Sequence, residues 1–188
     1  MARRNDDKTS LSRYIALILR HQPEKAGITL DHHGWAKVSE LISGINRTRK
    51  IDIETLRNIV ETDRKGRYSF SEDGEFIRAN QGHSVEVDVE LEEREPPEIL
   101  YHGTCKASVQ SINSQGLLPM TRLYVHLSND IDTAILTGRR KGDHRSPVVF
   151  MVKAGEMFRD GQKFFVSVNE VWLTKRVPPQ YLELEEKS

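Results

Sequence analysis

ILYHGTC, residues 99–105, and RLYVHLS, residues 122–128, belong to the stretch of sequence that decides the fold. Each is a short apolar run that carries a histidine, and each precedes a segment with apolar residues at helical spacing. The pattern predicts strand, helix, strand and helix in that order over residues 99–140. Where a strand gives way to a helix, outward-facing backbone N–H groups favour anions, so both runs are candidates for a ligand site.

The expected boundaries of these elements follow from their capping residues. Thr104 is expected to cap a helix that ends at Gly116, after a strand that closes near residue 101. Residues 123–127 predict the second strand, and Ser128 is expected to cap a helix that ends at Gly138. Between strand and helix, a His-Gly-Thr block offers a ring edge, a glycine that lets a ligand approach the backbone, and a hydroxyl.

The amino-acid composition is typical of a folded globular protein. The chain has 188 residues, of which 37% are hydrophobic and 30% charged, enough for one large domain or two small ones. Its longest apolar stretch, residues 15–19, is too short to span a bilayer, and no signal segment opens the chain. The single cysteine, Cys105, excludes an internal disulfide and favours the cytoplasm, and we interpret it as a small buried hydrophobic residue.

The net charge of zero conceals an uneven distribution. Residues 1–80 carry 15 basic and 12 acidic residues, residues 81–98 carry one and seven, and residues 99–188 carry 12 and nine. Two mildly basic lobes are therefore separated by an acidic segment, which is typical of a solvated linker or an edge strand. Mildly basic lobes permit a nucleic-acid partner but do not require one.

The N-terminal lobe is predicted to be mainly helical. A helix behind Thr9 and Ser10 is stopped by Pro23, so Arg20 and His21 fall in its last turn or just beyond it, where two cations also suit the helix dipole. Residues 27–30 and 35–38 predict a short strand pair.

Further along the lobe, Ser39 is expected to cap a helix, and residues 53–61 predict another. A hairpin of residues 67–71 and 75–79 follows. Helices followed by a two-stranded wing predict a winged-helix-like lobe over residues 1–84, and such lobes often bind nucleic acid.

The remaining chain is predicted to be rich in short strands. Residues 85–98 form the acidic linker or edge strand, and residues 99–188 form the second lobe, so the fold class is α+β. Further strand candidates are residues 147–152, 164–168 and 170–174. The sequence contains no Gly-rich dinucleotide fingerprint and no phosphate loop, so a bound dinucleotide would be held in another way.

Five blocks in order resemble the RNA 2′-phosphotransferase family over residues 10–184, and the second lobe resembles the NAD-binding half of ADP-ribosyltransferases. The blocks are LRHQP at 19–23, QGHS at 81–84, HGT at 102–104, VHLS at 125–128 and VWLT at 171–174. The resemblance implies an NAD-dependent enzyme of tRNA splicing. It would act on RNA with an internal 2′-phosphate and yield a 2′-hydroxyl, nicotinamide and ADP-ribose 1″,2″-cyclic phosphate.

The resemblance also implies roles for particular residues. The implied catalytic set is Arg20, His21, Arg67 and Arg122, in which arginines hold the phosphate and His21 donates to it or protonates the departing 2′-oxygen. The implied NAD-binding set is His102, Gly103, Thr104, His126 and Ser128. The constellation requires no metal.

Two other functions remain open at this point. One is an ADP-ribosyltransferase that acts on terminal phosphates of RNA or DNA, for which the same residues would serve. The other is a non-catalytic RNA-binding module, against which the complete set of catalytic residues counts. Residues 148–150 contain no acid, which argues against modification of proteins. We expect a cytoplasmic monomer that contacts RNA and NAD but no membrane.

Overall fold

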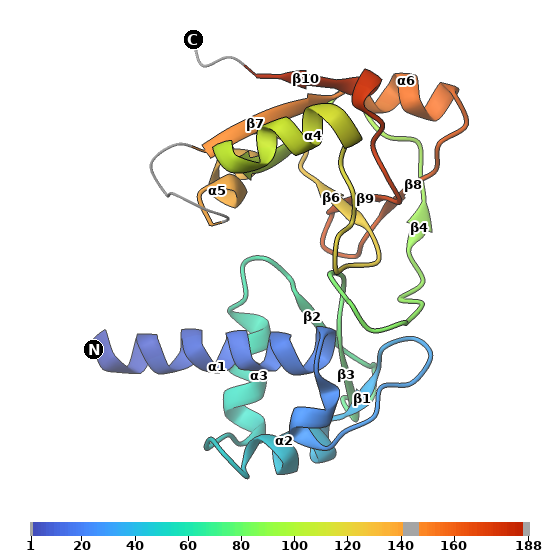
Figure 1. The fold of residues 1–188 in the computed structure, drawn as a ribbon. Helices are drawn as coiled ribbons and strands as arrows, with labels where there is room; N and C mark the ends of the chain where they lie inside the picture. The colour runs from blue at the N-terminus through green and yellow to red at the C-terminus, as the bar shows by residue number, and fades with distance from the viewer. Residues whose placement is uncertain (1, 141–146, 186–188) are drawn as a thin grey trace. The chain divides into compact units, whose positions relative to one another are not determined.

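The computed structural model describes residues 2–140 and 147–185, with side chains from residue 8 onward. Its contacts divide the chain into two compact units, Met1–Glu90 and Leu91–Ser188 (Figure 1). The division falls inside the acidic segment 85–98. Among the described residues, no helix is both long enough and apolar enough to cross a membrane.

Unit 1 combines helices with a small antiparallel sheet (Figure 1). Its elements are α1 (Ala2–Arg20), η1 (Pro23–Ala26), β1 (Ala36–Lys37), α2 (Val38–Ile45), α3 (Ile53–Glu61), β2 (Tyr68–Phe70) and β3 (Phe76–Ala79). The strand order is β1-β3-β2. Apolar residues of α1, α2 and α3, spaced three and four apart, form one core with Ile77 and Ala79 of β3.

The structure agrees with most of the predicted elements of unit 1, although α1 begins at Ala2 and not behind Thr9 and Ser10. Helix α3 has the predicted bounds, and Asp52 caps it by accepting a 2.8 Å hydrogen bond from the Thr55 N–H. The predicted hairpin is formed by β2 and β3. The strand pair was wrong, because residues 27–30 form no strand and β1 pairs with β3. Ser39 is not the cap of α2, since the helix already includes Val38 and its N-cap is Lys37.

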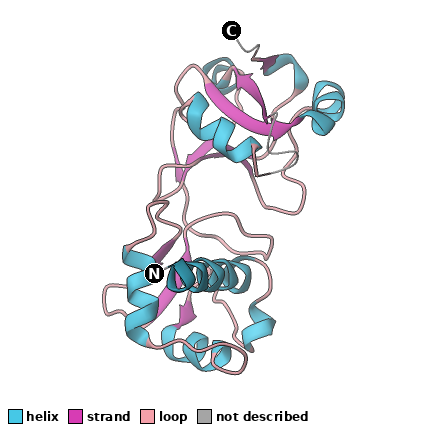
Figure 2. Cartoon of the chain, turned by 90° about the vertical axis from the view of Figure 1, so that its left-hand side faces the viewer, coloured by secondary structure: helices cyan, strands magenta, loops and turns pink. Residues whose placement is uncertain are grey.

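Unit 2 consists of short strands and short helices (Figure 2). Its strands are β4 (Glu92–Glu93), β5 (Leu100–Cys105), β6 (Val125–Leu127), β7 (Pro147–Val152), β8 (Phe164–Val166), β9 (Trp172–Thr174) and β10 (Leu182–Leu184). Its helices are η2 (Lys106–Ser108), α4 (Val109–Gln115), α5 (Ile131–Gly138), α6 (Ala154–Arg159) and η3 (Pro179–Tyr181). The strands form two antiparallel sheets, β10-β7-β5 and β4-β8-β9-β6. The described residues are therefore mixed helix and sheet, as the α+β class requires.

Two predicted capping residues of unit 2 were wrong. Thr104 lies inside β5, which continues to Cys105, so the helix that ends before Gly116 begins later than predicted. Helix α5 is capped by Asp130, whose side chain accepts a 2.7 Å hydrogen bond from the Thr133 N–H, and Ser128 lies two residues before it. The His-Gly-Thr block is thus part of a strand, and no helix N-terminus follows Thr104 directly.

The acidic segment also differs from expectation. Residues 85–91 contain no strand, and the only edge strand in this part of the described chain is β4. It pairs antiparallel with β8. The alternation of valines with acidic residues therefore did not identify a strand. The valines of this segment pack on a neighbouring turn, since Val87 and Val89 lie beside Gly34.

Candidate functional site

Arg20 and His21 lie at the end of α1, where the prediction placed them. Residues 82–84 run past this end of the helix. The Ser84 N–H donates a 2.9 Å hydrogen bond to the Arg20 carbonyl oxygen. A Cβ at Gly82 would lie 3.5 Å from Arg20 Nη1, so the guanidinium packs against that glycine. The segment therefore supports the first two candidate catalytic residues.

Ser84 also holds the His21 ring. Its Oγ lies 2.9 Å from His21 Nδ1, within hydrogen-bond distance. A hydroxyl donates to Nδ1 of a neutral imidazole and accepts from Nδ1–H of an imidazolium. This partner can therefore hold the same ring orientation in both protonation states, which suits a histidine that exchanges a proton.

Arg67 is held by Asp63 in the turn before β2. The Arg67 N–H donates a 2.7 Å hydrogen bond to Asp63 Oδ2, and the Arg67 guanidinium forms an ion pair with Asp63 Oδ1. The Asp63 side chain is only 7% exposed. A charged hydrogen bond to a largely buried carboxylate restricts the guanidinium more than an exposed pair would.

The buried Tyr68 connects the two arginines electrostatically. Its hydroxyl donates a 2.7 Å hydrogen bond to the Ser12 carbonyl. Burial raises the pKa of Tyr68, whereas the hydrogen bond with the Ser12 hydroxyl, 3.5 Å away, and the charges of Arg20 and Arg67 lower it. Arg20 and Arg67 therefore act on one hydroxyl, which places them in the same part of unit 1.

His83, next to Ser84, is a buried neutral ring. It is 2% exposed, and its Nε2 has no hydrogen-bond partner within the described ranges. Burial, followed by the charges of Arg20, His21 and Arg78, lowers the pKa of His83 to about 4. The ring therefore adds no positive charge beside Arg20 and His21 at neutral pH.

In unit 2, the HGT and VHLS blocks lie side by side. Tyr101 and Ser128 exchange two backbone hydrogen bonds, of 2.9 Å and 2.8 Å. His102 Nδ1 lies 2.9 Å from the His126 carbonyl oxygen, and His126 Nδ1 lies 3.1 Å from the Tyr124 carbonyl oxygen. A carbonyl only accepts, so both rings carry their proton on Nδ1, and Nε2 of each neutral ring is an acceptor.

Gly103 and Thr104 face the interior of unit 2. Both are buried, and a Cβ at Gly103 would lie 1.7 Å from the Ala134 carbonyl oxygen of α5. At this distance only glycine allows β5 and α5 to pack together. This glycine was predicted to allow the approach of a ligand, whereas the structure shows the approach of a helix backbone.

Arg122 lies in the turn before β6. Its N–H donates a 3.1 Å hydrogen bond to the Pro119 carbonyl oxygen, and the residue is exposed. Although the residue is exposed, neighbouring atoms partly desolvate its guanidinium, and this desolvation, followed by the charge of Arg140, lowers the pKa of Arg122. An arginine stays protonated at neutral pH despite such a shift, so Arg122 remains a cation that could meet an anionic ligand.

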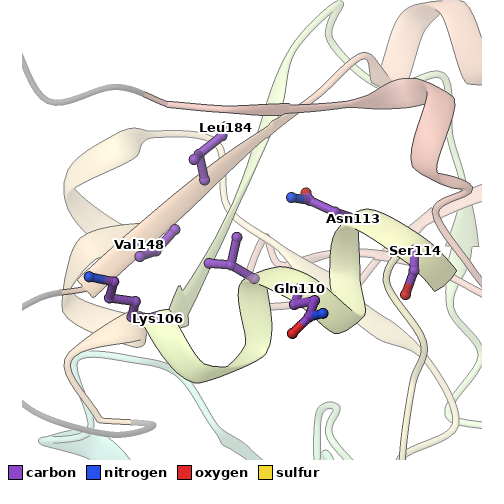
Figure 3. Close-up of a pocket in the computed structure, with 7 residues that line it drawn as sticks. Lys106, Gln110, Asn113, Ser114, Val148 and Leu184 are labelled. Carbon is purple, nitrogen blue, oxygen red and sulfur yellow. The ribbon is translucent and has the colours of Figure 1, made fainter.

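Unit 2 has two further features that could react with or bind a ligand. Cys105 is partly exposed rather than buried, and a hydrogen bond with Ser108 lowers its pKa, so its interpretation as a buried residue was wrong. A pocket of about 650 Å³ lies between α4 and the strands β7 and β10 (Figure 3). Its lining residues are Lys106, Val109, Gln110, Asn113, Ser114, Val148 and Leu184, none of which is a candidate catalytic or NAD-binding residue.

Sequence reasoning missed the residues that support the candidate site. Asp63 orients Arg67, Ser84 orients His21, and His83 fills the interior beside them. The QGHS block is one of the five blocks that resemble the family, but its spacing from Arg20 in the sequence does not indicate contact with α1. Among the described residues, no group of three or more His, Cys, Asp or Glu side chains could hold a metal ion.

Comparison with known proteins identifies the family. Residues 6–176 match the family described as RNA 2′-phosphotransferase, Tpt1 / KptA family. A probable RNA 2′-phosphotransferase of Flavobacterium johnsoniae is 46% identical over 177 residues, covering 94% of this chain and 96% of the relative. A protein of the same description from Nostoc punctiforme is 48% identical, covering 92% of this chain and 94% of the relative. Another, from Fusobacterium nucleatum, is 44% identical, covering 95% of this chain and 99% of the relative. The chain therefore belongs to the RNA 2′-phosphotransferase family.

Proposed function

We propose that the chain is an enzyme that transfers the internal 2′-phosphate of a spliced RNA to NAD. The products are the RNA 2′-hydroxyl, nicotinamide and ADP-ribose 1″,2″-cyclic phosphate. The observation that carries the proposal is the set of Arg20, His21 and Arg67 in unit 1, whose orientations are supported by Ser84 and Asp63. Planar guanidinium groups held in place are suited to a phosphate dianion.

In the first step, an oxygen of the RNA 2′-phosphate attacks the anomeric carbon of the nicotinamide riboside. The bond from that carbon to nicotinamide breaks, and nicotinamide leaves with the electron pair. Arg20 and Arg67 orient the phosphate, which raises the effective concentration of the nucleophile. Their positive charge also makes the phosphate oxygen less nucleophilic, so their net contribution to this step is limited.

In the second step, the neighbouring ribose 2″-hydroxyl attacks phosphorus and gives its proton to solvent, and the bond from phosphorus to the RNA 2′-oxygen breaks. Negative charge builds on the nonbridging oxygens, so a fixed Arg67 contributes more in the transition state than in the ground state. The departing 2′-oxygen needs a proton, which His21 donates through Nε2 while Ser84 holds Nδ1.

The two histidines of unit 2 fit an NAD site. With Nδ1 bound to backbone carbonyls, His102 and His126 present Nε2 as an acceptor. NAD carries ribose hydroxyls and a carboxamide that can donate to such an acceptor. The bridge between Tyr101 and Ser128 keeps both blocks together, and Arg122 supplies a cation for the diphosphate or for the migrating phosphate.

The decisive experiment uses RNA with one internal 2′-phosphate, labelled at its end. The chain is incubated with this RNA, with and without NAD, in the presence of a chelator. We expect loss of the 2′-phosphate and release of nicotinamide and the cyclic phosphate only when NAD is present. Activity that requires magnesium, or ADP-ribose that stays on a terminal phosphate as the final product, would refute the proposal.

A further inference from the structure

The outward side of unit 1 carries a group of basic residues beyond the candidate catalytic set. We call Arg13, Arg49 and Lys50 the α1 basic surface, because Arg13 lies on α1 and the other two lie in the loop that contacts it through Arg49. All three are exposed. Residues 8–23 and 41–51, which carry these side chains, contain no aspartate or glutamate, although Asp7, Glu24, Glu40 and Asp52 flank the two segments. The basic side chains therefore have no acidic neighbour within their own segments.

Specific contacts fasten the basic loop to α1. Arg49 Nη1 donates a 2.9 Å hydrogen bond to Ser10 Oγ, and the Arg49 guanidinium lies 4.4 Å from the centre of the Tyr14 ring. The Tyr14 and Thr48 hydroxyls are 3.5 Å apart. The charge of Arg49 is thus held beside the helix instead of moving freely in solvent.

Helical geometry relates this surface to Arg20. Leu11, Ile15, Ile18 and Leu19 are buried in the core of unit 1, which defines the inward side of α1. Arg13 and Arg20 are seven residues apart, or nearly two full turns, so they point in the same direction, about 10 Å apart along the axis. Arg13 makes no ion pair or hydrogen bond with other described residues.

We propose that the α1 basic surface binds the backbone phosphates of the RNA strand that flanks the 2′-phosphorylated nucleotide. The inference rests on the proposed function, because it takes Arg20 as the point where the 2′-phosphate is held. Phosphates at regular spacing along a strand match cations that continue from Arg20 towards the N-terminus of α1. Arg49 covers one face of the Tyr14 ring, so this ring is not open on that face for stacking with an RNA base. The surface would therefore bind RNA through charge, without regard to the base sequence.

The first test measures binding without turnover. A labelled single-stranded RNA lacking any 2′-phosphate is titrated with the wild type, Arg13→Gln, Lys50→Gln and the double variant over a series of salt concentrations. Each neutralised contact should lower the slope of log affinity against log salt by about 0.7, and the double variant by about twice that. Lys37→Gln is the matched control, because Lys37 is exposed in unit 1 and already paired with Glu40 at 3.6 Å.

The second test separates docking from chemistry. With a long 2′-phosphorylated RNA, Arg13→Gln should raise KM several-fold and leave kcat unchanged, whereas a minimal substrate without flanking nucleotides should show no change. In the binding test, the proposal is overturned if Arg13→Gln and Lys50→Gln have the same slope as the wild type, or if Lys37→Gln lowers the slope as much as they do. In the kinetic test, it is overturned if Arg13→Gln lowers kcat equally on the long and the minimal substrate. If the chain proved to have no transferase activity, the binding test would still decide the role of this surface.

Discussion

The buried His83 ring makes unit 1 sensitive to acid in a calculable way. Its pKa falls from the ordinary value of 6.5 to about 4 in the folded protein, because burial and nearby cations disfavour the charged ring. Between these values the unfolded chain binds a proton that the folded chain does not. Stability is therefore complete above pH 6.5 and is lost as the pH falls towards 4, by about 1.4 kcal/mol per pH unit and about 3 kcal/mol in total.

The assay compares His83 with an uncharged side chain of similar size. His83→Gln and the parent protein are both made in a Trp172→Phe background, so that fluorescence reports Trp35 and hence unit 1. Urea unfolding at pH 7.5 and pH 5.5 should show that the parent loses about 1.3 kcal/mol more than the variant between the two conditions. Subtracting the two pH dependences removes titrations that both proteins share.

A second measurement covers the possibility that His83→Gln does not fold. The ring protons of His83 are followed by NMR in the wild type as the pH is lowered. They should not titrate until the pH is well below 6. A His83 that titrates near 6.5 in the folded protein, or a variant with the same pH dependence as its parent, would refute this account of the buried ring.

Three further predictions concern the candidate site and its scaffold. Ser84→Ala should lower kcat about 3- to 10-fold by releasing the His21 ring, because one exposed hydrogen bond contributes about 1 kcal/mol. Ser84→Thr keeps the hydroxyl and should restore kcat, and equal losses in both variants would point to another cause. Arg67→Ala should slow the second step by about 100- to 1000-fold and the first step less. RNA 2′-phospho-ADP-ribose should then accumulate in the reaction and be visible on a denaturing gel, and its absence at all times would contradict the assigned role. Gly103→Ala should destabilise the protein by about 3 kcal/mol or more, because its methyl group would lie 1.7 Å from the Ala134 carbonyl oxygen, and a melting temperature equal to that of the wild type would show that α5 can move at little cost.

Elements with strong local signals were predictable from the sequence. Helix α3 has the predicted bounds because Asp52 caps a run of apolar residues at helical spacing. The strand β7 was predicted because it is a continuous apolar run. The position of Arg20 at the end of α1 followed from Pro23, which cannot continue a helix in the ordinary way.

Features that depend on contacts between distant residues were not predictable. Thr104 has the chemistry of a helix cap, but pairing of β5 with β7 along six residues extends the strand through it. Ser128 was displaced as a cap by Asp130, which lies closer to the helix. The contacts of Asp63 with Arg67 and of Ser84 with His21 are made by folding, and nothing in the local pattern distinguishes these residues from other polar residues in turns.

The hydrogen bond that orients His102 has a consequence for how this protein can vary over evolutionary time. Its acceptor is the main-chain oxygen of residue 126, which every amino acid possesses. A change of side chain at position 126 would therefore remove one ring but preserve the tautomer of the other, provided that β6 keeps its path. The same holds in the other direction, because the acceptor for His126 Nδ1 is the main-chain oxygen of residue 124, which does not depend on the side chain at position 102. Each of the two histidines can therefore be lost by mutation without changing the tautomer of the other.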